Sequence, residues 1–154
     1  MVDQVMFSCE KEDWGTPQWL FDALDKEFGF TIDVCASDDN AKCDRYYTIS
    51  DTGLLKDWGT EVCWCNPPYG PKQTGLWMHK AYSAAQSGAT VVVLAPARTD
   101  TKWFHEYAMK GEVRFLRGRL TFEGAPSTAP FPSLVCVFRP KEFELVSYGP
   151  ETSL

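Results

Sequence analysis

The run ATVVVLAP, residues 89–96, limits the possible folds more than any other part of this chain. Apart from one threonine it is entirely apolar, so it lacks the alternation expected of a strand that faces water on one side. Continuous apolar runs are typical of strands buried on both faces of a mostly parallel sheet. Helical patterns occur on both sides of this run along the chain. We therefore predict an α/β domain with a mostly parallel sheet and helices on both faces.

The remaining elements follow from periodicity and from turn residues. A helix is expected at about residues 17–28, with Thr16 as its N-cap, Pro17 in the first helical position and Gly29 as its end. A later helix ends at Gly88, and another begins after Asp100 as N-cap. The first of these two has an expected apolar face of Leu76, Ala81, Tyr82 and Ala85. Strands are expected at residues 30–35, 61–65, 112–116 and 133–140, and a weaker signal lies at 46–49.

The chain of 154 residues is long enough for one domain with a core, and it contains no repeat or linker. We expect an N-terminal arm at residues 1–13, a folded domain at 14–140 and a tail at 141–154. No apolar stretch reaches the roughly 20 residues that span a bilayer, and the N-terminus lacks the pattern of a signal peptide. A soluble, cytoplasmic protein without a membrane partner is the expectation.

The six cysteines form no C-x-x-C pair, and the two histidines do not have metal-ligand spacing. We interpret the cysteines as reduced thiols and expect no metal. A zinc site stays open as an alternative.

The net charge of −6 argues against a non-specific nucleic-acid binder, but the charge is unevenly distributed. Residues 1–60 hold 13 acids against 5 bases, whereas residues 61–154 hold 8 acids against 10 bases. A local patch that faces phosphates and an ordinary solvated surface are equally compatible with this pattern. The bases concerned are Arg98, Lys102, Lys110, Arg114, Arg117 and Arg119.

The stretch EVCWCNPPYG, residues 61–70, ends a predicted strand in a stiff corner. Each proline fixes φ and lacks an N–H, and a residue before proline is pushed to an extended conformation. Ligands of open parallel sheets bind at the carboxyl ends of the strands, which is where this corner lies.

The corner suits a planar substrate that carries an exocyclic amine. The side-chain oxygen of Asn66 and the carbonyl of Pro67 can accept the two amine hydrogens, and Tyr69 can stack on the ring. The nitrogen lone pair is then directed at an electrophile by positioning and fixed dipoles, without a strong general base. A tight turn with an incidental Pro-Pro pair is the alternative.

These residues also resemble a known family. The ordered segments WGTPQWLFDAL, DVCAS, NAKCDRYY, DTGLLKDW, WCNPPYG, APARTDTKWFHEY, RGRLTFEG and APFPSLVCVF are similar to the phage DNA N-6-adenine methyltransferases. The resemblance covers about residues 14–139. It implies a single Rossmann-like methyltransferase domain, S-adenosylmethionine as methyl donor and adenine in DNA as acceptor.

Residue by residue, the resemblance implies a catalytic loop of Asn66, Pro67, Pro68 and Tyr69. It implies donor-binding roles for Asp33 and Cys35 in IDVCAS, for Asp57 in LLKDW and for Thr16-Pro17 at the start of the first helix, with Asn66 beside them. Asp33 has the charge for the cationic methionine end of the donor. The usual Gly-x-Gly is missing after Asp33. Asp38 and Asp39 are both candidates for holding the ribose, and the sequence does not choose between them.

Adenine is stacked within the DNA duplex, so the family's reaction implies that the base flips out of it. Phe122 is the candidate to hold the flipped base opposite Tyr69. Arg98, Arg117 and Arg119 are candidate phosphate contacts by charge and loop placement. We expect no separate target-recognition domain, so sequence specificity is expected to be short, relaxed or supplied by a second copy of the chain in a homodimer or by a partner.

Three alternatives stay open. The same tetrapeptide also serves methyltransferases that act on adenine in RNA or on protein glutamine. A non-catalytic module could keep the fold and bind the cofactor or DNA without turnover. A structural phage protein with a zinc site is the third.

Overall fold

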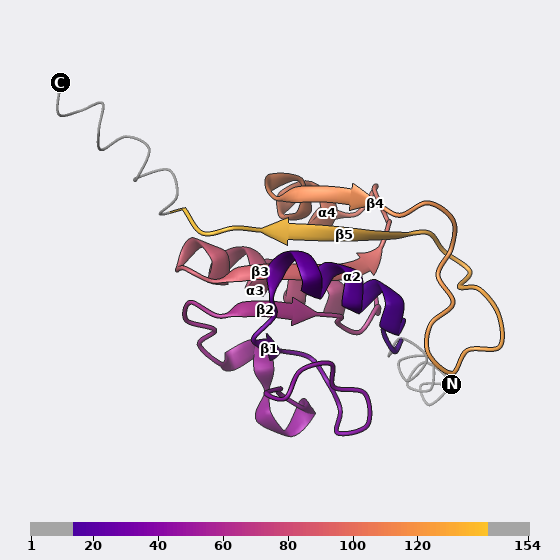
Figure 1. Cartoon of the computed structure of the whole chain (residues 1–154). Helices are drawn as coiled ribbons and strands as arrows, with labels where there is room; N and C mark the ends of the chain where they lie inside the picture. The colour runs from indigo at the N-terminus through magenta and orange to yellow at the C-terminus, as the bar shows by residue number, and fades with distance from the viewer. Residues whose placement is uncertain (1–13, 142–154) are drawn as a thin grey trace, which may run out of the picture.

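A computed structural model describes residues 14–141 of the protein, so the expected arm at 1–13 and nearly all of the expected tail lie outside the described residues. Five strands form one sheet in the order β1-β2-β3-β5-β4 (Figure 1). The strands are β1 (Ile32–Asp33), β2 (Val62–Cys65), β3 (Thr90–Pro96), β4 (Glu112–Phe115) and β5 (Ser133–Phe138).

The sheet is mixed, which corrects the expectation of a mostly parallel sheet. β1, β2 and β3 are parallel neighbours, whereas β5 lies antiparallel between β3 and β4. The segment 116–132 that joins β4 to β5 holds no helix, so the chain turns back and pairs beside the strand it has just left. Parallel neighbours need a longer crossover, such as the one that joins β2 to β3.

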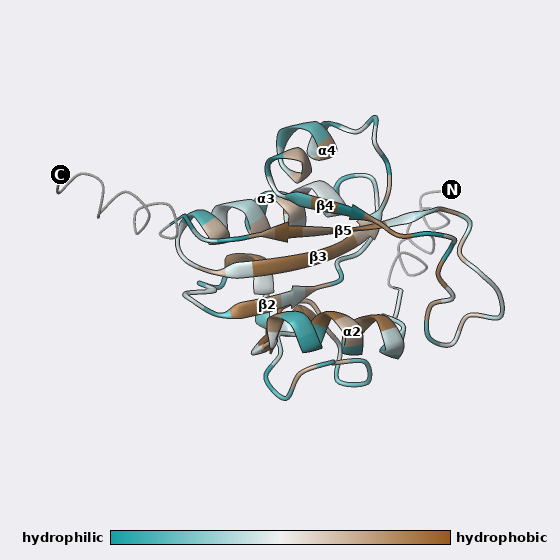
Figure 2. Cartoon of the chain, turned by 45° about the horizontal axis from the view of Figure 1, so that its top comes forward, coloured by the Kyte–Doolittle hydropathy of each residue, from teal (hydrophilic) through white to brown (hydrophobic). Residues whose placement is uncertain are grey.

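Helices cover both faces of the sheet. α2 (Gln18–Phe28) lies on one face, and α3 (Gln73–Gln86) and α4 (Lys102–Glu106) lie on the other (Figures 1 and 2). β3 contributes to both cores, because Val91, Val93 and Ala95 join the α3 side while Val92 and Leu94 join the α2 side. All five are fully buried. The apolar run is therefore a strand buried on both faces, as predicted.

The start of α2 differs from the prediction in a way that matters for the site. Pro17 is the N-cap, and its carbonyl accepts hydrogen bonds from the backbone N–H groups of Leu20 and Phe21. Thr16, predicted to be the N-cap, instead accepts a hydrogen bond from the side-chain nitrogen of Asn66 with its hydroxyl. The predicted end is confirmed, because Gly29 has a φ of 68° and donates its N–H to the carbonyl of Asp25.

Two details of the other helices were predicted wrongly. Leu76 is 55% exposed, whereas its neighbour Trp77 is buried; the predicted Ala81 and Ala85 do lie on the buried face. That face consists of Thr74, Trp77, Met78, Ala81 and Ala85. α4 is capped by Thr101, whose side chain accepts from the N–H of Phe104, so the N-cap lies one residue beyond Asp100. After α4 the chain forms a separate 3₁₀ turn, η3 (Ala108–Lys110).

The connection from β1 to β2 contains two 3₁₀ turns, η1 (Ile49–Asp51) and η2 (Gly53–Leu55). The strand predicted at 30–35 is shorter, and the weak signal at 46–49 is a single bridge between Tyr46 and Asp33. Trp58 anchors the connection, since its indole N–H is buried and donates to the carbonyl of Gly53 at 3.0 Å. Among residues 14–141, no helix is long and apolar enough to cross a bilayer.

Candidate active site

The three parallel strands bring chemically useful residues to one edge of the sheet. Asp33 ends β1, Asn66 directly follows β2, and Arg98 lies two residues beyond the end of β3. The carboxyl ends of parallel strands meet at this edge, which is the usual ligand-binding position in such sheets.

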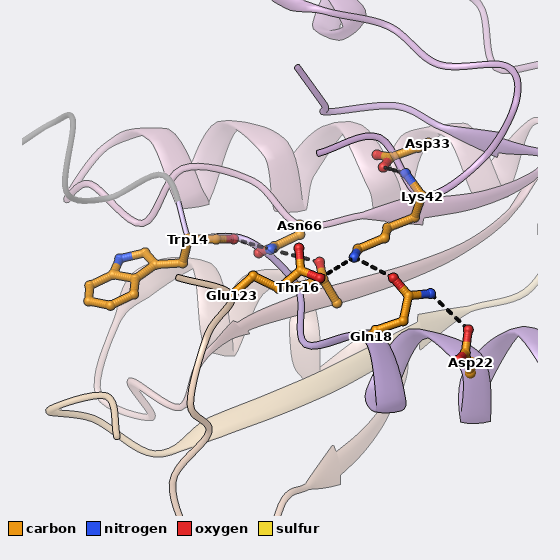
Figure 3. Close-up of polar contacts among 8 residues, drawn as sticks. All are labelled: Trp14, Thr16, Gln18, Asp22, Asp33, Lys42, Asn66 and Glu123. Atoms are coloured by element: carbon orange, nitrogen blue, oxygen red, sulfur yellow. Dashed lines mark hydrogen bonds and ion pairs between the residues drawn. The ribbon is translucent and has the colours of Figure 1, made fainter. Parts of the chain in front are cut away.

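Asn66 is 9% exposed, and its carboxamide has partners at both ends. Its Nδ2 donates to the carbonyl of Trp14 at 2.5 Å and to the hydroxyl of Thr16 at 3.0 Å (Figure 3). Its Oδ1 accepts from the hydroxyl of Tyr69 at 2.6 Å. Because a carbonyl oxygen can only accept, the nitrogen of Asn66 must face Trp14, and its oxygen must face Tyr69. The segment before α2 thus orients the acceptor oxygen of Asn66.

The backbone carbonyl groups of residues 67–69 differ in whether they accept a hydrogen bond. The hydroxyl of Thr74 donates to the carbonyl of Pro68 at 3.0 Å, and the Arg98 guanidinium donates to the carbonyl of Tyr69 at 2.9 Å. Within residues 14–141, no donor reaches the carbonyl oxygen of Pro67. A side-chain oxygen on Asn66 and a backbone oxygen on Pro67 are therefore adjacent acceptors in the chain.

Tyr69 is only 2% exposed and belongs to an aromatic cluster. Its ring meets Phe122 at 6.0 Å and Phe131 at 5.7 Å between centroids, and both contacts are edge-to-face. Trp14 packs on the same two phenylalanines at 5.1 and 5.5 Å. The structure thus brings the predicted pair Tyr69 and Phe122 together, with the two rings in direct contact.

Asp33 is 2% exposed, and its carboxylate accepts backbone N–H groups from Cys35 at 3.2 Å and Lys42 at 3.0 Å. Burial disfavours the charged form and raises the pKa of Asp33 to about 6, although the two N–H groups act in the opposite direction. A buried carboxylate of this kind would be stabilised by a cationic ligand.

A small hollow, partly open to solvent, is lined by both Asp33 and Asn66. The indole N–H of Trp64 in its lining is buried and has no hydrogen-bond partner within the described part of the chain. The lining includes four residues that the sequence predicted, namely Thr16, Asp33, Cys35 and Asn66. It also includes Trp14, Gly15, Asn40 and Trp64, which sequence reasoning missed.

The missed residues carried weak signals. Asn40 follows the two acids considered for the ribose, and its side chain accepts the N–H of Ser37 at 2.8 Å. Neither Asp38 nor Asp39 lines the hollow, and Asp38 accepts from the hydroxyl of Tyr46. Trp64 lies within the strand that leads to Asn66, where a purely structural role is the simplest interpretation of an aromatic residue.

Polar contacts tie the segment 116–132 to the start of α2 and to the loop after β1. The ammonium of Lys42 pairs with the carboxylate of Glu123 at 2.9 Å and donates to the side-chain oxygen of Gln18 at 2.7 Å (Figure 3). Gly15 and Glu123 also form an antiparallel bridge. The residues around Asn66 therefore come from the start of α2, the loop after β1 and the segment before β5.

Asp57 does not join this site. It is exposed, and its carboxylate accepts the N–H of Gly59 at 2.8 Å in a turn before β2. Strand β2 spans four residues, or about 13 Å at 3.3 Å per residue, and it separates that turn from Asn66. The carboxylate thus lies at the opposite end of the strand from the hollow.

The basic residues of the second half of the chain differ in their partners. Arg117 and Arg119 are exposed on the segment before β5, and within residues 14–141 neither forms an ion pair. Arg114 instead pairs with Glu27 and Glu112 on the side of β4. Among residues 14–141, no group of three or more potential metal ligands is close enough to hold an ion.

Comparison of the sequence with known proteins shows the family to which this chain belongs. A family model described as DNA N-6-adenine-methyltransferase (Dam) matches residues 5–148. The chain belongs to this family. The match spans all of the strands and helices described above and therefore includes both Asn66 and Asp33.

Individual relatives agree with this assignment. A DNA N-6-adenine-methyltransferase of Haemophilus phage HP1 is 32% identical over 97 residues, or 62% of this chain and 56% of the relative. One of Escherichia phage T1 is 30% identical over 95 residues, or 60% and 39%. The putative methyltransferase YfdM of Escherichia coli K12 is 37% identical over 65 residues, or 38% and 71%. The matched region spans about half of the HP1 enzyme and less of the T1 enzyme. Membership of a methyltransferase family implies a methyl donor.

Proposed function

We propose that this chain methylates the N6 amine of adenine in DNA, with S-adenosylmethionine as methyl donor. The observation that carries the proposal is the orientation of Asn66. Trp14 and Thr16 engage its nitrogen, while its oxygen accepts the hydroxyl of Tyr69 and keeps a second lone pair for a substrate. A neutral acceptor beside the carbonyl of Pro67 matches an amine that has two hydrogens to donate.

The reaction follows from these two acceptors. Asn66 and Pro67 hold the two amine hydrogens, which draws the nitrogen lone pair out of conjugation with the ring. S-adenosylmethionine supplies an electrophilic methyl group on a sulfonium sulfur. With the methyl donor bound, a carbon–nitrogen bond would form as the carbon–sulfur bond breaks, and the nitrogen would then lose one proton to solvent. Positioning and fixed dipoles supply the acceleration, so no strong base is required.

The residues of the hollow fit the methyl donor. Asp33 offers a buried carboxylate whose pKa is raised to about 6 by burial, and the methyl donor is cationic at its methionine end. Trp64 offers an indole N–H that lacks a partner among residues 14–141. Asn40 and Thr16 add polar groups, and Cys35 presents its backbone beside Asp33. We assign these five residues to donor binding and leave Asp57 out.

Adenine enters by opening the aromatic cluster. Tyr69 and Phe122 touch each other, so a flipped base must separate them before it can stack on Tyr69. Trp14 and Phe131 are half-buried and form the outer part of the cluster. Stacking of the base on Tyr69 then takes the place of the packing between Tyr69 and Phe122. This stacking offsets part of the few kcal/mol that flipping costs.

The wider setting completes the proposal. Arg117 and Arg119 are free to contact the phosphates of DNA, and a second copy of the chain or a partner supplies target recognition. The site at the carboxyl ends of three parallel strands supports a Rossmann-like origin for this part of the sheet. Because two of the relatives are enzymes of bacterial phages, we expect the reaction to take place in the cytoplasm of a bacterial host.

The test uses the full chain, labelled S-adenosylmethionine and unmethylated DNA, followed by digestion of the DNA to nucleosides. Label is expected in N6-methyldeoxyadenosine and is expected to disappear in Asn66→Ala. Label in RNA or in protein glutamine, with none in DNA, would show that the proposed DNA substrate is wrong. Binding of S-adenosylmethionine without any methyl transfer would show that the chain is a binding module and not an enzyme.

A further inference from the structure

The two prolines leave part of the corner's geometry undetermined. Their rings fix φ at Pro67 and Pro68, and ψ of Pro67 is restricted because a proline follows it. Neither restriction applies to ψ of Pro68 or of Tyr69. Because β2 and α3 hold both ends of the corner, rotation at these two positions would be compensated at neighbouring bonds and would shift the Pro67 peptide with its carbonyl.

Two side chains from other elements hold those rotatable peptides. Thr74, fully buried in the first turn of α3, donates to the carbonyl of Pro68 at 3.0 Å. Arg98, after β3, donates from Nη1 to the carbonyl of Tyr69 at 2.9 Å. Hydrogen bonds from a charged donor are stronger than neutral ones. The carbonyls on either side of the Tyr69 nitrogen are thus held, while that of Pro67 is left available.

The arginine is itself anchored. Its backbone N–H donates to the carbonyl of Pro96 at 2.8 Å, and its carbonyl accepts the hydroxyl of Thr101 at 2.7 Å. β3 therefore presents the guanidinium to the loop from a fixed position at the next strand end.

We propose that Thr74 and Arg98 are positioning residues, which hold the backbone after Pro67 so that its carbonyl accepts the substrate amine. This rests on the proposed function and deepens it. Arg98 thereby changes from a candidate DNA contact to a group that acts through the backbone of Tyr69. Neither residue touches the reacting atoms.

The first experiment measures kcat and KM for DNA at several salt concentrations. Arg98→Met is expected to lower kcat by about 100-fold, because small displacements of reacting groups have effects of that size. Its KM for DNA and the salt dependence of KM should stay close to wild type. Arg98→Lys should recover only part of kcat, because an ammonium does not reproduce the planar fork. Lys102→Met removes the same charge from an exposed site and should leave kcat unchanged.

The second experiment separates the hydroxyl of Thr74 from its bulk. Thr74→Val keeps the shape and removes the donor, so kcat should fall by about tenfold, the effect of losing one ordinary hydrogen bond. Thr74→Ser keeps the donor and should recover most of kcat. A Thr74→Val enzyme with wild-type kcat would overturn this role. Raised KM and a salt slope reduced by about one for Arg98→Met, with kcat kept, would make Arg98 a phosphate contact instead.

Amide hydrogen exchange supplies a readout that needs no substrate. The N–H groups of Tyr69 and Gly70 should exchange faster in Arg98→Met and Thr74→Val, while those of β3 stay protected. Unchanged exchange in both variants would overturn the proposal. Faster exchange in these variants, in a protein whose wild type methylates no DNA, would keep the loop's positioning and reject the proposed substrate.

Discussion

The ends of the neighbouring strands β1 and β2 each place one buried polar side chain in the site, but the two side chains differ in charge and in hydrogen-bond partners. Asp33 and Asn66 are both buried, and both line the same hollow. Asp33 carries a charge and receives two N–H groups from its own loop, within nine residues. Asn66 is neutral, and two of its partners, Trp14 and Thr16, are at least 50 residues away in sequence. A charged group can bind a cationic donor, whereas a neutral acceptor can hold an amine without competing for its protons.

The difference should appear most strongly when the acceptor of Asn66 is removed. Asn66→Ala should lower methyl transfer by about 1,000-fold, by analogy with loss of one preorganised group in an active site. Donor affinity should be nearly unchanged, because Asp33 stays in place. Single-turnover transfer and calorimetry measure the two quantities.

Asn66→Asp is the matched control. It keeps an oxygen acceptor but has no donor for the carbonyl of Trp14, so it should retain part of the rate and become sensitive to pH. Wild-type turnover in Asn66→Ala would show that the acceptor does not carry the reaction.

The charge of Asp33 should make the unliganded protein sensitive to pH. Its pKa of about 6 in the fold exceeds the ordinary value of 3.8, so the folded state binds more protons between these two values. The contribution of Asp33 to stability is fully present below pH 3.8 and is lost as pH rises through about 6. The full loss is about 3 kcal/mol, at about 1.4 kcal/mol per pKa unit.

Denaturant unfolding of wild type and Asp33→Asn from pH 4 to pH 7 checks this expectation. The stability difference between the two proteins isolates Asp33, because all other acids are shared. Wild type should lose stability relative to the variant as pH rises, and a difference that is constant with pH would reject the raised pKa.

Removing Asp33 should affect donor binding more than the chemical step. Asp33→Ala should weaken S-adenosylmethionine binding by about 10- to 100-fold, the value of a hydrogen bond to a charged group. Asp33→Asn should lose most of the same affinity if the charge matters. Calorimetry measures both, and unchanged affinity in either variant would remove Asp33 from the donor site.

Asp57 should behave as a residue outside both strand ends. Asp57→Ala removes only its hydrogen bond to Gly59 in an exposed turn, so stability should fall by about 0.5 kcal/mol. Donor affinity should stay within about twofold, a free-energy change below about 0.5 kcal/mol. A large loss of donor affinity, measured as for Asp33, would return Asp57 to the site.

Local patterns predicted local structure well. The apolar run 89–96 became a strand buried on both faces, and α2 ended at Gly29 as its sequence indicated. Predictions that depend only on neighbouring residues were wrong by little; for example, the N-cap of α4 is Thr101 in place of Asp100. The direction of β5 was missed, because it depends on which strand the chain returns to and not on the residues of β5.

Some features of the site could likewise be predicted from local sequence, whereas others depend on tertiary contacts. Asp33 and the corner at residues 66–69 are recognisable from residue types beside strand signals. The carbonyl of Trp14, the closed aromatic cluster and the bond from Arg98 to Tyr69 carry no comparable signal. The charge of Arg98 by itself predicts a phosphate contact, but its guanidinium donates to a carbonyl because β3 and β2 are neighbours.

The sequence by itself determined which groups of this protein can do chemistry, and only the tertiary structure decided what each group faces. Residue type and neighbouring residues determine charge, φ restrictions and the ends of helices, since these act over a few bonds. Contacts such as that between Trp14 and Asn66, 52 residues apart, depend on how separate elements pack on the sheet. Packing of that kind is selected by the whole core, because no single segment can bury its apolar face alone.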